Sequence, residues 1–455
     1  MRFGRVSPLQ VFKFTHVRGQ YTGGQYHKSN RKKVLFVIYD WIGGGSERNI
    51  YNLFKELKQD FDLRLLILNL FRETYDLGQI NVKIYRFPNS VTLPCDKIIK
   101  FKLFILDKIL REIPIVGDHI VNFLVSIRVL YRGVRKLREV VKIEKPDLVF
   151  CFVNDTNIVC LLSKLMFSSV KTSFIISVRN QLSNDMKYVK SSCVILYSIY
   201  KGLIRFLYNT TAEKIVTVSK GVKKDLIQNF QIIPKKIRVI YNGIPIKDIE
   251  ELAKEEIEPE LKYFFGQPVF KLVTLARLTE QKGINFLIDA FAETRQRYEF
   301  KLVILGDGHL RTELEEQAKK LEVFEDILFL GWRKNPFKYM AHCDLFVMSS
   351  LGEGFGLSLL EAMALGLPVI STDCAGPREI LDNGKYGILI PSANKQALVQ
   401  AISKVLEDSI LRKCLREKAK ERATLFSLEK MAMEYGRLIK NVLKESDYET
   451  YKGNN

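Results

Sequence analysis

Cysteine and histidine are scarce in this sequence, and neither residue type is clustered. The 455 residues include seven cysteines, an odd number without a CxxC pair, and five scattered histidines. A disulfide framework and a thiolate zinc site are therefore excluded, and the cysteine usage is typical of a reduced, cytosolic protein. In the second half of the chain no Asp-x-Asp pair ends a predicted strand. The sequence predicts no bound metal ion.

Long apolar runs are absent as well. Stretches such as residues 193–200 fall well short of the roughly 18–20 residues that span a bilayer, so no transmembrane helix is predicted. Residues 1–30 are polar, contain glycine and follow no period, and the basic N-terminus lacks the apolar segment of a secretory signal. We expect a flexible leader over residues 1–30.

Acidic residues are few in the first half of the chain. Residues 1–240 carry 41 Lys and Arg against 18 Asp and Glu, a net charge of +23, whereas the remaining residues carry −3. This strong positive charge in the first half favours a polyanionic partner, either nucleic acid or an anionic membrane surface. A basic domain that is merely soluble is the simpler alternative.

Short apolar runs alternate with helical spacings along most of the chain. The first run is KVLFVIY at residues 33–39, and the alternation restarts after an acidic, helix-leaning stretch that ends near residue 268. This pattern predicts an α/β fold with two Rossmann-like, doubly wound parallel-sheet domains. We predict a leader at residues 1–30, a first domain at 31–245 and a linker at 246–268. A second domain follows at 269–427, and a C-terminal helix with a tail at 428–455. Ligands of such sheets bind beyond the carboxyl ends of the strands, so two facing domains would form one cleft.

The most specific motif is SSLGEGFGLSLLEAMALGLPVIST at residues 349–372. A predicted strand ends in a glycine-rich loop, where Gly354 and Gly356 allow the backbone to approach a ligand, and the loop opens into an apolar helix with free N–H groups. The helix contains one carboxylate, Glu361, which needs polar partners such as ligand hydroxyls, and Glu353 precedes it by eight residues. A core helix with one surface glutamate, preceded by a solvated loop, is the structural alternative.

This segment resembles glycosyltransferase family 4, through E-x7-E with GFG between the glutamates and E-A-M-A-x-G-x-P-V-I at its end. The resemblance extends over about residues 32–443 and implies the GT-B fold and retaining, nucleotide-sugar-dependent transfer. It implies that Glu361 binds the ribose hydroxyls of the donor and that Glu353 contacts the transferred sugar. It also implies that the amides of Phe355, Gly356 and Leu357 contact the donor near its phosphates.

Two cations follow the first strand of the second domain, in LVTLARLTEQKG at residues 272–283. Arg277 and Lys282 are expected at the ligand edge of the sheet, where they would stabilise the charge that develops on a diphosphate leaving group. Solvated surface cations are the alternative, but R-x4-K also resembles the diphosphate pair of the family. Since these cations and a helix dipole can replace a metal ion, we expect metal-independent transfer with no cofactor besides the nucleotide-sugar co-substrate.

Two other loops of the second domain resemble family segments. Gly306 belongs to a G-D-G turn similar to the family's G-x-G turn. Trp332 and Arg333 follow another predicted strand, in a loop that meets the nucleobase in the family. The resemblance therefore implies that Gly306, Trp332 and Arg333 lie near the donor.

In the first domain, IGGGSER at residues 42–48 follows the first strand and resembles the family's GG-x-E-R loop. The resemblance implies that Gly44 and Gly45 let the backbone reach the sugar diphosphate or the acceptor; a plain tight turn is the alternative. A dinucleotide site is excluded, because it would need G-x-G-x-x-G and an acidic residue at the end of the second strand.

The first domain lacks a histidine in its predicted cleft loops, although many members of the family have one there. Asn154, Asp155 and Arg179 lie at predicted strand ends and are the candidates for the polar partner of the reacting sugar.

Residues 97–145 and 187–208 interleave Lys and Arg with large apolar residues at helical spacing. This composition is typical of an interfacial amphipathic helix, and helices with a buried face and a basic outer face are the alternative. The family resemblance favours an anionic membrane, because many members act on lipid-linked acceptors.

The sequence therefore predicts a retaining glycosyltransferase that takes a hexose or N-acetylhexosamine from a nucleotide sugar, expected to be a UDP-sugar. The expected acceptor is a lipid-linked sugar in polysaccharide or glycan biosynthesis, and the expected location is the inner face of the cytoplasmic membrane, as a peripheral protein. Transfer to a soluble acceptor is the alternative of the same fold. A basic nucleic-acid-binding protein is the alternative of another class, but no nucleic-acid-binding module is present and no nucleic-acid partner is expected.

Overall fold

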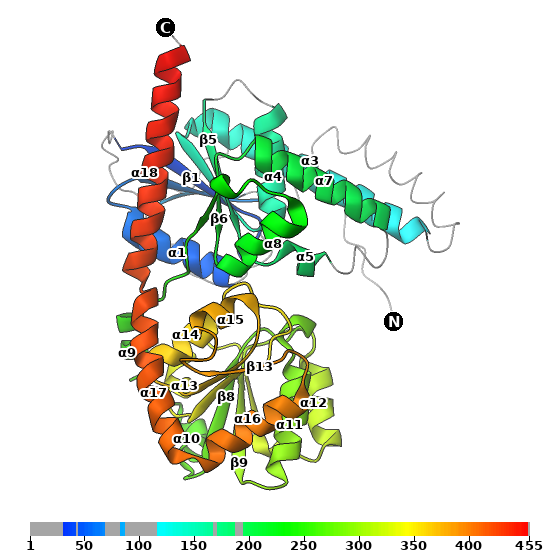
Figure 1. Cartoon of the computed structure of the whole chain (residues 1–455), viewed down its shortest axis with the longest axis vertical. Coiled ribbons are helices and arrows are strands. Elements are labelled where there is room, and N and C mark those ends of the chain that lie inside the picture. Colours follow the sequence, from blue (N-terminus) through cyan, green and yellow to red (C-terminus); the bar gives the residue numbers. More distant parts are fainter. Residues whose placement is uncertain are drawn as a thin grey trace, which may run out of the picture.

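The computed structural model describes residues 31–41, 44–68, 82–86, 116–166, 171–186 and 194–453. They form two α/β domains, each with a parallel sheet between layers of helices (Figure 1). Within the described residues, the first sheet has the strand order β3-β2-β1-β4-β5-β6-β7 and the second has β10-β9-β8-β11-β12-β13. The two doubly wound domains predicted from the apolar runs are confirmed.

The strands of the first domain are short apolar segments. They are β1 (Lys33–Ile38), β2 (Asp62–Ile67), β3 (Lys83–Arg86), β4 (Leu148–Phe152), β5 (Ser173–Val178), β6 (Lys214–Thr217) and β7 (Ile237–Val239). In β1, Val34 and Phe36 pack on one face of the sheet while Leu35 and Val37 pack on the other. Since both faces are buried, the strand reads as a continuous apolar run rather than an alternating one.

Helices cover both faces of the first sheet. One apolar cluster joins the sheet to α1 (Gly45–Leu57) and to the C-terminal helix α18 (Leu428–Gly453), which returns from the second domain along the first (Figure 1). The other face contacts helices of the central part of the domain: α3 (Val116–Glu144), α4 (Asn154–Met166), α5 (Leu182–Asp185), α7 (Val194–Thr210) and α8 (Lys220–Phe230). Among the described residues, none of these helices is long and apolar enough to cross a membrane.

The second domain has the same construction. Its strands are β8 (Phe270–Leu275), β9 (Phe300–Leu305), β10 (Ile327–Gly331), β11 (Leu345–Met348), β12 (Val369–Thr372) and β13 (Ile388–Ile390). Its helices are α9 (Ile246–Leu252), α10 (Pro259–Gly266), α11 (Ile284–Arg295), α12 (Arg311–Lys320), α13 (Phe337–Met340), α14 (Leu357–Ala364), α15 (Ala375–Ile380), α16 (Lys395–Glu407) and α17 (Ser409–Ala423).

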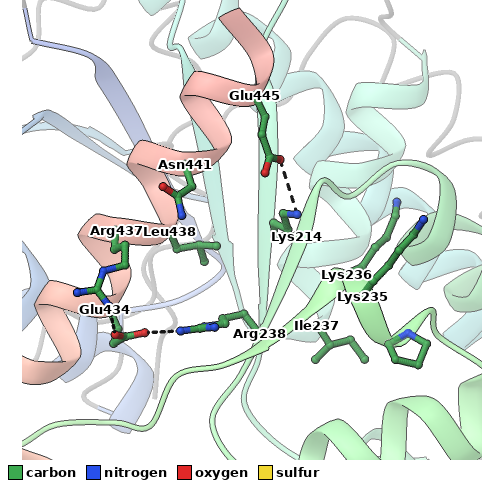
Figure 2. Close-up of a pocket in the computed structure, with 11 residues that line it drawn as sticks. Lys214, Lys235, Lys236, Ile237, Arg238, Glu434, Arg437, Leu438, Asn441 and Glu445 are labelled. Carbon is green, nitrogen blue, oxygen red and sulfur yellow. Dashed lines mark hydrogen bonds and ion pairs between the residues drawn. The ribbon is translucent and has the colours of Figure 1, made fainter. Parts of the chain in front are cut away.

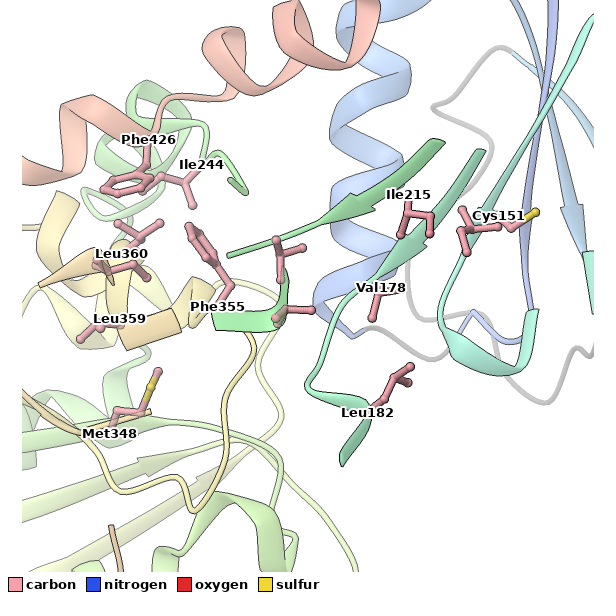
Figure 3. Packing of buried hydrophobic residues seen from close by; sticks show 14 of the residues in the cluster. Cys151, Val178, Leu182, Ile215, Ile244, Met348, Phe355, Leu359, Leu360 and Phe426 are labelled. Atoms are coloured by element: carbon pink, nitrogen blue, oxygen red, sulfur yellow. The ribbon is translucent and has the colours of Figure 1, made fainter. Parts of the chain in front are cut away.

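The chain crosses between the domains twice, and the two crossings are bonded to each other. The Ile244 amide donates to the Phe426 carbonyl, and the Leu428 amide donates to the Ile244 carbonyl, both at 3.0 Å. Tyr241 and Phe355 stack with ring centroids 5.8 Å apart, and the Phe426 ring contacts both. Figure 3 shows Phe355 and Phe426 on facing sides of this junction. The loop that carries Phe355 is therefore anchored in the apolar junction between the domains.

Candidate active site

The strand order of each sheet reverses at one point, and ligands of doubly wound sheets bind there. The reversal lies between β1 and β4 in the first sheet and between β8 and β11 in the second. The loops after β1 and β11 contact each other across the domain interface, because a Cβ added to Gly45 would lie 3.1 Å from Leu357 Cδ1. The two reversal points therefore face the same region between the domains.

At the reversal point of the second sheet, the loops after β8 and β11 are tied together. Lys282 Nζ lies 2.5 Å from Glu353 Oε2, and both side chains are mostly buried. Gln281 Nε2 donates to the Gly352 carbonyl at 2.8 Å, and Ser349 Oγ donates to the Lys282 carbonyl at 3.0 Å. The structure thus brings together a predicted diphosphate cation and the carboxylate predicted to contact the sugar.

Glu361 is the buried carboxylate of α14. It is 2% exposed, and its Oε1 forms an ion pair with Arg48 of α1, on the other domain. Its Oε2 is buried without a hydrogen-bond partner among the described residues. A buried carboxylate oxygen without a donor is costly, so this atom is suited to accept hydrogen bonds from a ligand.

Two glycines of the G-E-G-F-G loop are required by geometry. A Cβ on Gly354 would lie 2.0 Å from the Arg179 carbonyl oxygen of the first domain, so a side chain there would push the domains apart. Gly356 has φ +108°, a conformation that other residues rarely adopt, and it forms the N-cap of α14. No side chain of the described residues caps this helix, so its first N–H groups are suited to bind an anion.

The other predicted donor residues lie at strand ends without evident ligand geometry. Arg277 is exposed and has no side-chain partner among the described residues. Gly306 has φ +119°, and a Cβ there would lie 1.9 Å from the Ala276 carbonyl, so chain packing alone already requires glycine. Trp332 is 53% exposed, and the Arg333 guanidinium lies over the Tyr339 ring, 5.8 Å from its centroid. Contact of these residues with a donor stays a prediction.

The first domain contributes a group of carboxylates beyond β4 and β5. Asn154 Nδ2 donates to Asp185 Oδ2 at 3.0 Å. Burial, together with Asp155 and Asp225, raises the pKa of Asp185 to about 6, and burial raises the pKa of Asp155. Among the described residues, none of these three aspartates pairs with a Lys or Arg, so no cation offsets the effect of Asp155 and Asp225 on Asp185.

Arg179, a candidate partner of the reacting sugar, has a side chain that is already engaged. Its Nη2 donates to Asn242 Oδ1 at 2.7 Å, its Nη1 donates to Tyr435 Oη at 3.3 Å, and its guanidinium lies over the Phe152 ring. Burial lowers the pKa of Arg179. These contacts hold the interdomain linker and α18 together, which favours a structural role over contact with the sugar.

The part of the chain that the structure describes contains no evident metal-binding site. No group of three or more His, Cys, Asp or Glu side chains in that part is arranged to hold a metal ion. Metal independence itself stays a prediction.

The sequence motifs did not indicate two interdomain contacts. Arg48 belongs to the GGGSER motif, but its pairing with Glu361 depends on how the domains face each other. Glu379 of α15 accepts hydrogen bonds from the Lys220 and Gly221 amides, at the start of α8 on the other domain, at 2.9 and 2.7 Å. The same carboxylate accepts from Tyr241 Oη at 2.9 Å, and burial together with the Glu379 charge raises the pKa of Tyr241.

Comparison with known proteins gives the family of the chain. A model described as Glycosyltransferase Family 4 matches residues 43–248, and one described as Glycosyl transferases group 1 matches residues 261–422. A relative from Campylobacter jejuni is 31% identical over 404 residues, which are 88% of this chain and 97% of the relative. The chain belongs to the family 4 glycosyltransferases.

The relatives of this glycosyltransferase include enzymes named for lipid substrates. The Campylobacter jejuni relative is N-acetylgalactosamine-N,N'-diacetylbacillosaminyl-diphospho-undecaprenol 4-alpha-N-acetylgalactosaminyltransferase. The alpha-monoglucosyldiacylglycerol synthase of Streptococcus pneumoniae is 27% identical over 271 residues, 58% of this chain and 60% of that one. HepE of Anabaena, solved with UDP and glucose, has a TM-score of 0.69 at 20% identity and covers 90% of this chain and 100% of its own. That likeness shows the GT-B fold implied by the motifs.

Proposed function

We propose that this glycosyltransferase moves a hexose or N-acetylhexosamine from a UDP-sugar to a lipid-linked sugar acceptor, with retention of anomeric configuration. The observation that carries the proposal is the Glu361 carboxylate, buried with one oxygen on Arg48 and the other without a partner among the described residues. Vicinal ribose hydroxyls are donors that fit the second oxygen. HepE of Anabaena, with the same fold, was solved with UDP, which supports the choice of nucleotide.

The diphosphate fits the loops beside Glu361. Its charge would replace Glu353 as the anionic partner of Lys282, while the uncapped N-terminus of α14 would donate backbone N–H groups to it. Glu353 would then accept a hydrogen bond from a hydroxyl of the transferred sugar. Arg277, exposed at the end of β8, would supply a second cation.

In the proposed transfer, the bond between the sugar C1 and the diphosphate oxygen breaks, and the bond between C1 and the acceptor oxygen forms on the same face. The acceptor proton passes to the departing phosphate oxygen, so no strong protein base is required. Lys282 and Arg277 lower the barrier, because the negative charge that they meet increases as the C1–O bond breaks.

The names of two relatives support the acceptor class and the stereochemistry. One name specifies a diphospho-undecaprenol substrate and an alpha linkage, and the other specifies an alpha-glucosylated diacylglycerol. Both are lipids whose apolar part lies in a membrane. A peripheral position on an anionic leaflet would bring such an acceptor to the first domain.

Two parts of the predicted membrane-binding stretches lie among the described residues. From residue 130 onward, α3 is a core helix with Val134, Leu137 and Val140 buried, and Lys136 Nζ donates to the Leu68 carbonyl at 2.8 Å. The alternative of a packed helix therefore holds for this part, while residues 97–115 lie outside the described residues.

Helix α7 is the better candidate for membrane contact. Its Ile199 and Phe206 are 64% and 50% exposed, and Arg205 is exposed next to Phe206. In the described part of the chain, neither Lys201 nor Arg205 forms an ion pair with a carboxylate. Cations beside exposed apolar side chains are the arrangement by which an interfacial helix binds an anionic bilayer.

The test is a transfer assay with a panel of nucleotide sugars and two acceptors, one with a polyprenyl diphosphate and one water-soluble. We expect a UDP-sugar to be consumed, with an α-linked product on the lipid-linked acceptor. The variant for this test carries Ile199→Ser, Phe206→Ser, Lys201→Gln and Arg205→Gln. Its activity on the lipid-linked acceptor in vesicles should fall, while its activity on the soluble acceptor should stay unchanged. Equal loss on both acceptors would contradict membrane contact by α7, and transfer to the soluble acceptor alone would favour the soluble-acceptor alternative.

A further inference from the structure

A pocket of about 390 Å³ lies in the first domain at the end of the sheet opposite to the candidate active site. It opens where β6 and β7 begin, whereas the active-site loops follow the carboxyl ends of the strands. One wall is formed by α18, and the other by the turn at Pro234–Lys236 and the strand after it (Figure 2). No part of the proposed transfer reaction uses this pocket.

The pocket is lined by more positive charge than its own carboxylates can neutralise. Five basic side chains and two carboxylates line it, so its net charge is +3. Glu434 accepts from Arg238 at 2.9 Å and from Arg437 at 2.8 Å, and Glu445 lies 3.6 Å from Lys214. Both acidic groups are therefore already used within the wall.

Two lysines are left without a carboxylate. Among the described residues, neither Lys235 nor Lys236 forms an ion pair, and their side chains lie across the pocket from α18 in Figure 2. Lys235 is exposed, whereas Lys236 is half-buried, with its Nζ donating to the Ala212 carbonyl at 2.7 Å. Burial and the neighbouring cations Lys164, Lys214 and Lys235 lower the pKa of Lys236, although Glu213 opposes this. A bound anion would relieve this repulsion.

We propose that this pocket binds a phosphate-bearing organic anion, with the phosphate on Lys235 and Lys236 and the organic part between Pro234 and the facing wall of α18. The volume lies within the usual range of small-molecule sites and exceeds that of phosphate alone. Lysine ammonium groups, each a point charge with three donors, suit a tetrahedral dianion.

The binding would also affect the arrangement of the domains. Arg437 and Leu438 belong to α18, which follows the second domain along the chain and packs on the first. The remaining walls belong to β6, β7 and the turn before β7 in the first domain. A ligand that contacts both walls would strengthen the attachment of α18 to the first domain.

The test is calorimetric titration of the full chain with glucose 6-phosphate, in the presence of enough UDP to occupy the donor site. We expect saturable binding that weakens at least about tenfold in Lys235→Gln/Lys236→Gln, because two charge-assisted contacts are lost. The control variant is Lys404→Gln/Lys413→Gln, which replaces two exposed lysines on α16 and α17 and changes the net charge equally. It should bind glucose 6-phosphate like the wild type.

A parallel co-sedimentation with phosphatidylglycerol vesicles identifies the source of the phosphate. Loss of glucose 6-phosphate binding in the Lys235/Lys236 variant indicates a soluble ligand, and loss of vesicle binding in that variant alone indicates a lipid headgroup. Either result supports the pocket. If neither probe distinguishes this variant from the wild type, or if the Lys404/Lys413 control loses binding equally, the proposal is wrong. Because UDP binding is measured separately, failure here leaves the proposed transfer reaction untouched.

Discussion

The two sides of the domain interface differ in how their carboxylates are paired. On the second domain, Glu353 pairs with Lys282 of the same domain, and Glu361 pairs with Arg48 of the first domain. On the first domain, Asp155, Asp185 and Asp225 lie near one another, and in the described part of the chain none has a cationic partner. These aspartates belong to the half of the chain that carries the net charge of +23.

This difference shows that net charge does not predict the charge of a site. Among the described cations of the first half, Lys235 and Lys236 lie at the far end of the sheet and Arg205 on α7, whereas Arg48 lies at the candidate active site. An anionic donor would therefore be held by the second domain. Carboxylates such as those of Asp155 and Asp185 can accept hydrogen bonds from the hydroxyl groups of a neutral sugar.

The largest effect is expected from the cations of the second domain. Lys282→Ala or Arg277→Ala should lower kcat by about a hundredfold to a thousandfold, since loss of one group that stabilises transition-state charge has effects of this size. Steady-state rates with the UDP-sugar measure this, and Lys404→Ala should behave like the wild type. If the substitution of either residue lowers kcat by less than tenfold, that residue is only a surface cation. The comparison between the two sides of the interface would then no longer hold.

A smaller effect is expected from Arg48, because its proposed influence on the ribose is exerted only through Glu361. Arg48→Gln should raise KM for the donor about threefold to tenfold with little change in kcat, because the carboxylate loses the partner that orients it. In a Glu361→Gln background, Arg48→Gln should raise KM for the donor by less than about twofold more, because the effects of mutating two contacting residues are not additive. Equal effects in both backgrounds would show that Arg48 acts independently of Glu361.

The acidic side predicts a modest dependence of stability on pH. The pKa of Asp185 is raised to about 6, so the folded state holds a proton that the unfolded state has lost, and stability falls as pH rises from about 4 through 6. Asp185→Asn cannot ionise, so its Tm should exceed that of the wild type at pH 7, and the gap should close towards pH 4. Thermal scans across this range measure the gap, and a constant difference would contradict the raised pKa.

The smallest expected effect concerns metal ions. Lys282, Arg277 and the N-terminus of α14 offer positive charge to the diphosphate, so EDTA should leave the transfer rate unchanged. Rates before and after chelation, and after magnesium or manganese is added back, provide the measurement. Loss with EDTA and recovery with either metal would contradict the cation-only account.

The sequence predicted most strands because they are buried on both faces and read as apolar runs, as β1 and β4 do. The short edge strand β3 (KIYR) was missed, because it is only partly buried and carries a cation at each end. The motifs predicted Lys282, Glu353 and Glu361 as neighbours of one ligand, since they follow strands that meet at a reversal point.

Contacts between the domains could not be predicted in the same way. The pairing of Arg48 with Glu361 and the bonding of Glu379 to the start of α8 depend on the relative placement of two separate sheets. No periodicity within one segment carries that information. Arg179 illustrates the same limit, because its position at a strand end does not indicate the bonds of its guanidinium to Asn242 and to Tyr435 of α18. Its contact with the reacting sugar stays a prediction.

The central claim is that the Glu361 carboxylate receives the ribose of the donor nucleotide, and UDP calorimetry tests it most directly. Glu361→Gln should weaken UDP binding about tenfold to a hundredfold, because hydrogen bonds to a charged acceptor are worth about 1.5–3 kcal/mol. Glu313→Gln, an exposed glutamate of α12, is the matched control and should bind UDP like the wild type. If Glu361→Gln keeps the UDP affinity of the wild type, Glu361 is a buried structural carboxylate and the account is wrong.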